Sequence, residues 1–210
     1  MHTSHPVVFL LDDDEPVVTA LSRLLRAEGF ATSAWTSAEQ FLANHDARTP
    51  GCLVADVLMP QMDGLELQRV FAERGIDRPM VFITGQGDIP TVVRAMKAGA
   101  VTLLPKPVER TQLVAAVREA IANDAAQRAR RRGQEDVARR LASLTPRERQ
   151  VLGLVTTGML NKQIAAQLGA AEKTIKVHRG RIMTKMQVRT AAALVGLVSQ
   201  VERPRSVPMS

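Results

Sequence analysis

VVFLLDDD (residues 7–14) is an apolar run of five residues that stops abruptly at three carboxylates. The same change recurs within the first 106 residues, in CLVAD (52–56), MVFIT (80–84) and LLPK (103–106). Short continuous apolar runs are typical of strands that are buried on both faces of a parallel sheet. Ligands of such sheets bind outside the carboxyl ends of the strands, so these carboxylates, the hydroxyl and the ammonium should converge on one crevice.

Helical patterns separate these apolar runs. Apolar side chains recur every three to four residues over 17–25 and again over 92–96, and a glycine follows each pattern, Gly29 or Gly99. A fifth strand is expected over Ala31–Trp35, and a closing helix over about 109–123. Strands that alternate with helices predict an α/β fold with a doubly wound, five-stranded parallel sheet.

Charge divides the chain into two unlike parts. Residues 1–124 contain 11 Lys and Arg against 16 Asp and Glu, a net charge of −5, whereas residues 125–210 contain 17 against 5, a net charge of +12. The five Phe and the one Trp all lie in the acidic part. The basic part therefore cannot stack on single-stranded bases, and we expect it to meet the phosphates of a duplex.

The sequence also argues against several classes of protein. Cys52 is the single cysteine, which leaves no disulfide or cysteine-based metal site within one chain. Its apolar stretches are far shorter than the ~20 residues of a membrane span, and MHTSHP (1–6) does not have the pattern of a signal peptide. A Gly-rich phosphate loop is missing, which argues against a nucleotide-driven activator. We expect a cytoplasmic protein that does not bind membranes.

Between the two parts, residues 125–142 are rich in Ala, Arg and Gln and have few apolar anchors. This composition predicts an exposed linker that is helical or partly flexible. Its run of Arg128 and Arg130–Arg132 either adds contacts to a DNA backbone or is a solvated charged face, and the second interpretation is favoured. The expected domains are therefore residues 6–122, a helical linker over 123–141, and a second domain over 142–202.

The second domain begins at a well-marked helix start. Thr145-Pro146-Arg147-Glu148 combines a capping hydroxyl, a proline at the first helical position and a glutamate for a capping box. The pattern then predicts a helix to about residue 157, a short helix after a cap at Asn161, a longer helix through Met186 and a last helix after Thr190. Residues 203–210 are expected to be a disordered tail.

The short helix, the glycine turn and the longer helix have the lengths of a helix-turn-helix within a small all-α domain. Ile175, Ile182 and Met186 recur at helical spacing and are expected to face the core. The opposite face can enter a major groove and contact bases or phosphates; it comprises Lys173, Lys176, Val177, Gly180 and Thr184, flanked by Arg181 and Lys185. The alternative is an amphipathic helix with an ordinary solvated cationic face. His178 has no second His or Cys at ligand spacing, so metal binding is not expected there.

The acidic crevice of the first domain suits a hard divalent cation. Mg²⁺ prefers oxygen ligands, and we expect Asp13 and Asp56 to bind it directly, Asp12 to act through water, and the backbone carbonyl of Leu58 to complete the shell. A carboxylate in such a site can accept a phosphoryl group. Lys106 would then pair with one phosphoryl oxygen, and Thr84 would hydrogen-bond another.

These segments resemble a known domain. LLDDDEP, VADVLMPQMDG, FITGQGD and LLPKP are similar to the four signatures of a two-component receiver, over about residues 6–122. The resemblance implies a flavodoxin/CheY-like fold in which Asp56 is the phosphoacceptor, Asp12 and Asp13 are the acidic pair, and Thr84 and Lys106 stabilise the phosphoryl group. One position departs from the pattern, because Leu103 stands where receivers usually carry a switch aromatic. The conformational coupling then either uses Leu103 packing under Thr84, or is weaker or differently routed.

The basic domain has a resemblance of its own. LTPRERQVL, NKQIA and TIKVH are similar to the LuxR-type DNA-binding domain of the NarL/FixJ family of response regulators, over about residues 142–200. The resemblance implies that Lys176 and Val177 read bases and that other residues contact the DNA backbone, namely Asn161, Lys162, Thr174, His178 and Lys185. Ala171 stands where this family usually places a capping Ser or Thr, a loss that typically costs ~1 kcal/mol of helix stability.

Together the two resemblances imply a response regulator and not an enzyme. A sensor histidine kinase would phosphorylate Asp56, and the chain would then dimerise through residues 88–97 and 106–117, bind double-stranded promoter DNA and meet RNA polymerase. A rival keeps the DNA binding without the phosphate control, as Leu103 allows. A second rival is a phosphatase that works through an aspartyl phosphate, although such enzymes usually place the nucleophile after the first strand.

Overall fold

The structure, a computed structural model, describes residues 5–85 and 89–202, with the backbone alone for 200–202. The chain forms two compact units that divide between Arg128 and Ala129. The tail expected over residues 203–210, and residue 88 of the expected dimer surface, lie outside the described residues.

The first unit is built on a five-stranded parallel sheet, as predicted. The strands are β1 (Val7–Leu11), β2 (Ala31–Trp35), β3 (Gly51–Asp56), β4 (Met80–Thr84) and β5 (Thr102–Pro105), in the order β2-β1-β3-β4-β5. The register places Leu11 beside Ala55 and Asp56 beside Ile83. The polar residues that end β1, β3 and β4 therefore emerge at one edge of the sheet.

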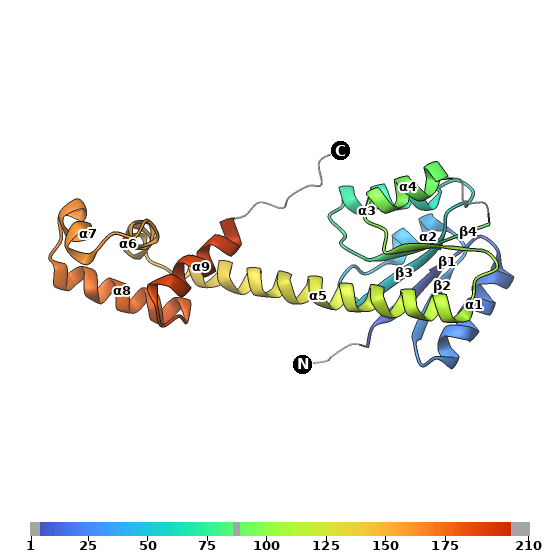
Figure 1. Cartoon of the computed structure of the whole chain (residues 1–210), viewed down its shortest axis with the longest axis horizontal. Helices are drawn as coiled ribbons and strands as arrows, with labels where there is room; N and C mark the ends of the chain where they lie inside the picture. Colours follow the sequence, from blue (N-terminus) through green and yellow to red (C-terminus); the bar gives the residue numbers. More distant parts are fainter. Residues whose placement is uncertain (1–4, 86–88, 203–210) are drawn as a thin grey trace. The chain divides into compact units, whose positions relative to one another are not determined.

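Helices cover both faces of this sheet (Figure 1). On one face lie α1 (Glu15–Ala27) and the first part of α5 (Arg110–Ala142), and on the other lie α2 (Ala38–Asn44), α3 (Gly64–Glu73) and α4 (Ile89–Lys97). The apolar runs supply both cores because alternate side chains of a strand point to opposite faces. Val8 and Leu10 pack toward α1 and α5, whereas Phe9 and Leu11 pack toward α2 and α3.

Helix α5 is one continuous element of 33 residues, so the expected closing helix and the expected linker are the same helix. Its beginning packs in the first unit through Leu113 and Val117, and its end packs in the second unit through Val137. Residues 129–135 are exposed between these anchors. Within the described part of the chain, no helix, α5 included, is both long and apolar enough to cross a membrane.

The second unit contains α6 (Pro146–Thr156), α7 (Asn161–Leu168), α8 (Glu172–Met186) and α9 (Ala191–Glu202). The capping box predicted for α6 is confirmed, because Thr145 Oγ1 accepts a bond from the Glu148 amide and Glu148 Oε2 accepts one from the Thr145 amide. The predicted cap of α7 is wrong by one residue. Asn161 is the first helical residue, and the side chain of Gln163 accepts a bond from the amide of Leu160.

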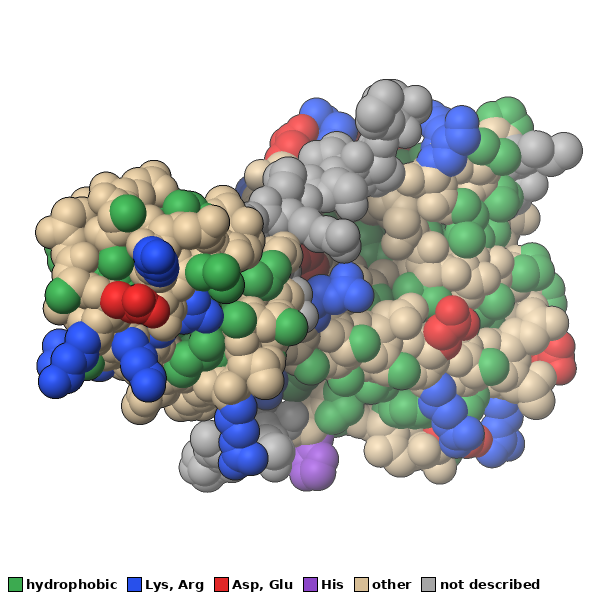
Figure 2. All heavy atoms as spheres, turned by 60° about the vertical axis from the view of Figure 1, so that its left-hand side comes forward, with side chains coloured by type: hydrophobic (Ala, Val, Ile, Leu, Met, Phe, Trp, Pro, Cys, Tyr) green, Lys and Arg blue, Asp and Glu red, His purple; other side chains and the backbone are tan. Residues whose placement is uncertain are grey.

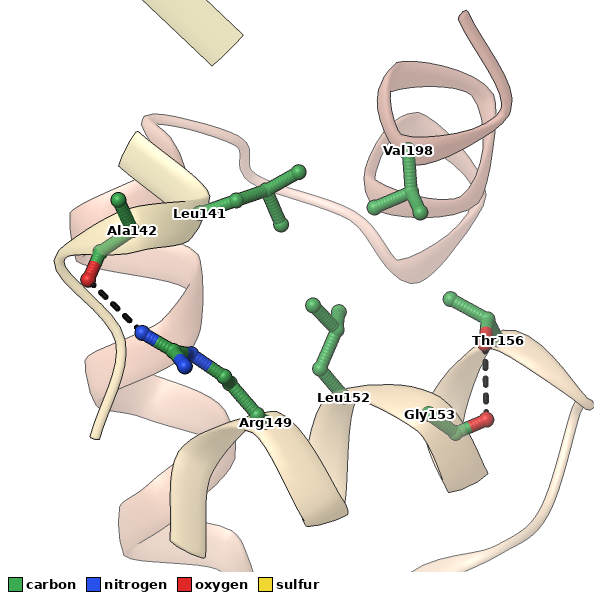
Figure 3. A pocket seen from close by; sticks show the side chains of 7 residues that line it. All are labelled: Leu141, Ala142, Arg149, Leu152, Gly153, Thr156 and Val198. Atoms are coloured by element: carbon green, nitrogen blue, oxygen red, sulfur yellow. Dashed lines mark hydrogen bonds between the residues drawn. The ribbon is translucent and has the colours of Figure 1, made fainter. Parts of the chain in front are cut away.

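A hollow of about 500 Å³ lies between the end of α5, α6 and α9 (Figure 3). Leu141, Leu152 and Val198 point into it. Arg149 at its rim donates a hydrogen bond to the carbonyl oxygen of Ala142 at 3.0 Å. Among the described residues, those that line this hollow include no carboxylate, histidine or cysteine.

Candidate functional site

The carboxyl edge of the sheet brings together an ammonium group and two buried carboxylates. Asp12 follows β1, Asp56 ends β3, and Lys106 follows β5. The Nζ atom of Lys106 lies 2.7 Å from Oδ2 of Asp12 and 2.7 Å from Oδ2 of Asp56. Asp12 and Asp56 are separated by 44 positions in the sequence, and Asp56 and Lys106 by 50. They meet here because parallel strands end at one edge of the sheet. The strand ends therefore bring these two carboxylates and the ammonium together, as the sequence predicts.

A third carboxylate, from exposed Asp13, completes the cluster. One oxygen atom each from Asp12, Asp13 and Asp56 lies within 4.8 Å of the others. Three carboxylates against one ammonium leave negative charge unbalanced, and a hard cation with oxygen ligands would balance it. The donor set thus fits Mg²⁺.

Backbone amides hold the two buried carboxylates in place. The amide of Asp14 donates to Oδ1 of Asp12 at 3.0 Å, and the amide of Leu58 donates to Oδ1 of Asp56 at 3.1 Å. Each carboxylate therefore uses one oxygen for the backbone and turns the other toward Lys106. Leu58 holds Asp56 through its amide, and metal binding by its carbonyl stays a prediction.

Gly64 is a site residue that the sequence reasoning did not single out, although it lies in the quoted segment VADVLMPQMDG. A Cβ atom at this position would lie 2.5 Å from the carbonyl oxygen of Asp56 and 2.8 Å from the Phe82 ring. The start of α3 therefore packs directly against the backbone of Asp56. Only glycine permits this close approach.

Lys106 remains charged in this environment. Burial lowers the pKa of Lys106, but its hydrogen bonds to Asp12 and Asp56 act in the opposite direction and prevail, so that the pKa is raised above its ordinary value. A cation at this position neutralises part of the acidic cluster. It also offers a donor to any further anion that enters the crevice.

Thr84 and Leu103 lie on the two strands beside this site. Thr84 ends β4 and is 2% exposed, and its carbonyl oxygen accepts a bond of 2.8 Å from the amide of Lys106. Leu103 is half-buried and packs with the core on the face of α2, α3 and α4. The segment that carries Lys106 is thus tied to the end of β4, whereas a switch role of Leu103 stays a prediction.

Helix α8 of the second unit presents two contrasting faces. Ile175, Ile182 and Met186 are buried, as predicted. The opposite face is exposed, and Val177 is 48% exposed. It brings together Lys173, Thr174, Lys176, Val177, Gly180, Arg181 and Thr184. Most charged side chains on the side of this unit turned forward in Figure 2 are Lys or Arg.

Lys185 has partners inside the protein, and its expected contact with a DNA backbone stays a prediction. Its Nζ atom lies 2.7 Å from Oε2 of Glu148 and 3.0 Å from the carbonyl oxygen of Ser143. The hydrogen bond from Lys185 lowers the pKa of Glu148, and the bond from the Thr145 amide lowers it further. The ammonium of Lys185 is therefore occupied in joining α8 to α6.

The other residues expected to contact the DNA backbone differ in the hydrogen bonds that they make within the protein. Lys162 is exposed, whereas Oδ1 of Asn161 accepts a bond from Arg179 at 2.9 Å. His178 is half-buried, and its buried Nδ1 atom has no hydrogen-bond partner among the described residues. Ala171 caps α8 without a side-chain hydrogen bond, as its methyl group requires.

A doubly wound sheet with an acidic crevice, followed by a helix-turn-helix, defines a receiver domain joined to a DNA-binding domain. Family models agree with this description. The response regulator receiver domain matches residues 8–118, and the luxR family of bacterial regulatory proteins matches residues 142–198. The chain belongs to the two-component response regulators of the NarL/FixJ type.

Relatives cover nearly the whole chain. The response regulator protein TodT of Pseudomonas putida is 41% identical over 93% of this chain and 86% of its own length. The transcriptional regulatory protein FixJ of Rhizobium meliloti is 42% identical over 90% of this chain and 92% of its own. Among solved structures, the response regulator StyR is 46% identical with a TM-score of 0.84, and the match covers 93% of this chain and 99% of that one.

Proposed function

We propose that Asp56 accepts a phosphoryl group from a sensor histidine kinase. The observation that carries this proposal is the meeting of the Asp56 carboxylate, the Lys106 ammonium and the acidic pair at one edge of the sheet. An oxygen of Asp56 forms the new bond to phosphorus as the bond from phosphorus to the kinase histidine breaks. Lys106 then shifts from the carboxylate to a phosphoryl oxygen, and the Thr84 hydroxyl binds another.

Asp13 and Asp56 would hold Mg²⁺ directly, with Asp12 acting through water and the Leu58 carbonyl as a further ligand. The bound ion would supply positive charge to the phosphoryl oxygens during transfer. The protein itself supplies orientation, because the amides of Asp14 and Leu58 fix the two buried carboxylates. Asp12 and Asp56 are buried, whereas Asp13 is exposed.

We infer that phosphorylation promotes a homodimer through α4 and the adjacent part of α5. Val93 and Met96 lie three residues apart on α4 and are 43% and 44% exposed, which suits a protein interface. Thr84 ends the strand that precedes α4, so a change at its hydroxyl can reach this surface. Phosphorylation shifts the equilibrium only if the dimer-forming conformation binds the phosphoryl group better.

The second unit is proposed to bind promoter DNA through the exposed face of α8 and so to act on RNA polymerase. Lys176 and Val177 are the proposed base readers. The proposed contacts to the DNA backbone come from Lys173, Thr174, His178 and Arg181 on α8 and from Asn161 and Lys162 on α7. Gly180 lets the helix come close to the duplex. Lys185 is assigned to holding α8 in place instead.

The decisive test is intact mass and oligomeric state after treatment with acetyl phosphate and Mg²⁺. One labile phosphoryl group and a shift toward dimer in the wild type, both missing in Asp56→Asn, would support the proposal. Asp63→Asn is a matched control, because Asp63 is an acidic residue in the segment after Asp56 and its side chain caps α3. It should be phosphorylated like the wild type.

A wild-type protein that takes up no phosphoryl group under conditions that modify another receiver would contradict the proposal. The chain would then be a DNA-binding protein without phosphate control, the rival that Leu103 allows. Phosphorylation without any change in dimerisation or DNA affinity would mean that Asp56 accepts the phosphoryl group but that this does not control DNA binding.

A further inference from the structure

The amino end of the receiver sheet, opposite the Asp56 crevice, contains a second charged cluster. Four consecutive carbonyl groups in the loop before β3 accept hydrogen bonds from two guanidinium groups. Arg78 donates to the carbonyls of Asp46 and Thr49 at 3.2 and 2.9 Å. Arg128 donates to those of Arg48, Ala47 and Thr49 at 2.8, 3.0 and 2.9 Å. Both arginines thus share the Thr49 carbonyl.

Arg128 is also held by a buried carboxylate one turn earlier in α5. Its Nε atom lies 2.8 and 2.7 Å from the two oxygens of Asp124, which is 2% exposed. Oδ2 of Asp124 also accepts the amide of Gly51 at 2.8 Å, at the start of β3. We call Asp124 and the carbonyls of Ala47, Arg48 and Thr49 the Arg128 socket.

The neighbouring Arg78 gives the loop its shape. It is 6% exposed and lies over the Phe9 ring, 4.2 Å from the ring centre, and its Nε atom donates to Nε2 of His45 at 2.8 Å. Burial, together with the charge of Arg78, lowers the pKa of His45 to about 4, so the imidazole is neutral and can accept this bond. The Arg128 socket is therefore preformed by a buried side chain.

Gly51 closes the same end of the sheet. Its φ of +138° is a conformation that other residues rarely adopt, and a Cβ atom there would lie 1.8 Å from the carbonyl oxygen of Val7. The amide that binds Asp124 is thus fixed by the close approach of β1 and β3. A rigid strand end, and not a loose loop, supports the socket.

Arg128 differs sharply from the rest of its arginine run. The side chain of Arg128 is 22% exposed and satisfied by the socket, whereas Arg130, Arg131 and Arg132 are exposed. Only a guanidinium has the planar fork of donors that can reach a carboxylate and three carbonyls together, which a lysine cannot do. Arg128 is also the last residue of the first compact unit.

We propose that the Arg128 socket fixes α5 where it leaves the receiver, and that this anchor is required for the phosphorylation state of the receiver to change DNA binding. The proposal rests on the proposed function. Without the anchor, the last turns of α5 in the receiver are held by fewer contacts, and a change in the receiver is no longer transmitted along a helix of defined position. Arg128 is a positioning residue, at the opposite end of the sheet from Asp56.

The test compares full-length wild type with Arg128→Ala, Arg128→Lys and the control Arg132→Ala, which removes the same charge from the exposed part of the run. Amide hydrogen exchange should become at least about tenfold faster over 46–51 and 125–131 in both Arg128 variants and stay unchanged in the control. Phosphoryl uptake from acetyl phosphate should remain at the wild-type level. The gain in affinity on phosphorylation, measured with a duplex selected by the wild type from random-sequence DNA, should be lost only in the Arg128 variants.

Because Arg128→Ala leaves the Asp124 carboxylate buried without its cation, the double variant Asp124→Asn/Arg128→Ala provides a second route if the single variant unfolds. It should give the same faster exchange and the same loss of coupling. Wild-type exchange in the folded Arg128 variants, or faster exchange with coupling retained, would overturn the proposal. If the wild type takes up no phosphoryl group, the proposed function fails, and the exchange comparison alone decides whether the socket anchors α5.

Discussion

Two buried carboxylates in this protein accept a hydrogen bond from a lysine at the same distance, but their surroundings differ. In the first unit Lys106 lies 2.7 Å from Asp56, and in the second Lys185 lies 2.7 Å from Glu148. Both carboxylate side chains are less than a tenth exposed, at 9% and 3%. The pair geometry alone therefore does not distinguish a reactive site from a structural one.

The difference lies in the charge and in the unused hydrogen-bonding capacity around each pair. Lys106 is shared between Asp12 and Asp56, with Asp13 nearby, so the site keeps an excess of negative charge that a cation can balance. Glu148 faces one lysine, and Oε2 also accepts the Thr145 amide of the capping box. A neutral, satisfied pair joins two helices, whereas an unbalanced one is available for chemistry.

The largest expected effect is on phosphoryl uptake. Asp56→Asn should abolish the labile phosphoryl adduct seen by intact-mass measurement, because the carboxamide of Asn is too weak a nucleophile to attack phosphorus. Glu148→Gln should leave the adduct unchanged. An adduct that persists in Asp56→Asn would mean that another carboxylate, such as exposed Asp13, is the acceptor.

The next effect is on stability and on its response to Mg²⁺. Removing one partner from a buried ion pair is costly, and we expect Lys185→Met to lower the free energy of unfolding of the second unit by about 2 kcal/mol, less than for a fully buried pair because Lys185 is partly exposed. Mg²⁺ should not restore this loss. Lys106→Met should destabilise the first unit, and there Mg²⁺ should restore stability because it replaces the missing positive charge.

These changes can be measured separately. Trp35, the single tryptophan, lies on β2 and reports unfolding of the first unit by fluorescence, while hydrogen exchange of α8 amides reports the second. An equal response of both variants to Mg²⁺ would contradict the distinction between the two sites.

A smaller effect is expected in the salt dependence of DNA binding. Arg181→Ala should reduce the slope of log affinity against log salt by about one unit, as the loss of one phosphate contact requires. Lys185→Met, studied where the domain is still folded, should leave the slope unchanged because the ammonium of Lys185 is bound to Glu148. A reduced slope in Lys185→Met would restore its expected role as a phosphate contact.

The smallest effect is on the pH dependence of stability, and its direction differs between the two sites. The pKa of Glu148 is lowered below 4.5, so the pair stabilises the fold above that pH and the contribution is lost as pH falls through the lowered pKa. The pKa of Lys106 is raised above 10.5, so its contribution is present below that pH and is lost as pH rises through the raised pKa. Denaturant titrations of Glu148→Gln and Lys106→Met should remove the acid and the alkaline dependence respectively.

The sequence alone predicted the sheet and the residues of the Asp56 crevice. Strands buried on both faces are visible as continuous apolar runs, and the residue after each run must lie at the carboxyl edge. The capping box at Thr145 and the buried face of α8 were equally predictable, since both depend on neighbours within four residues or on helical periodicity. Helices α2 and α3 were not located individually.

Only the tertiary structure decided which charged side chains are free. The sequence predicts a solvated face for the run that contains Arg128, and a basic face of α8 beside Lys185. In the structure, each of these two side chains donates a hydrogen bond to a residue distant in the sequence. Partners such as the Arg48 carbonyl, 80 positions from Arg128, have no signature in local periodicity. The physical reason is that a charge becomes structural only when the fold removes it from water and supplies partners. Sequence determined the elements and the reactive edge, and tertiary packing determined the roles of the remaining charges.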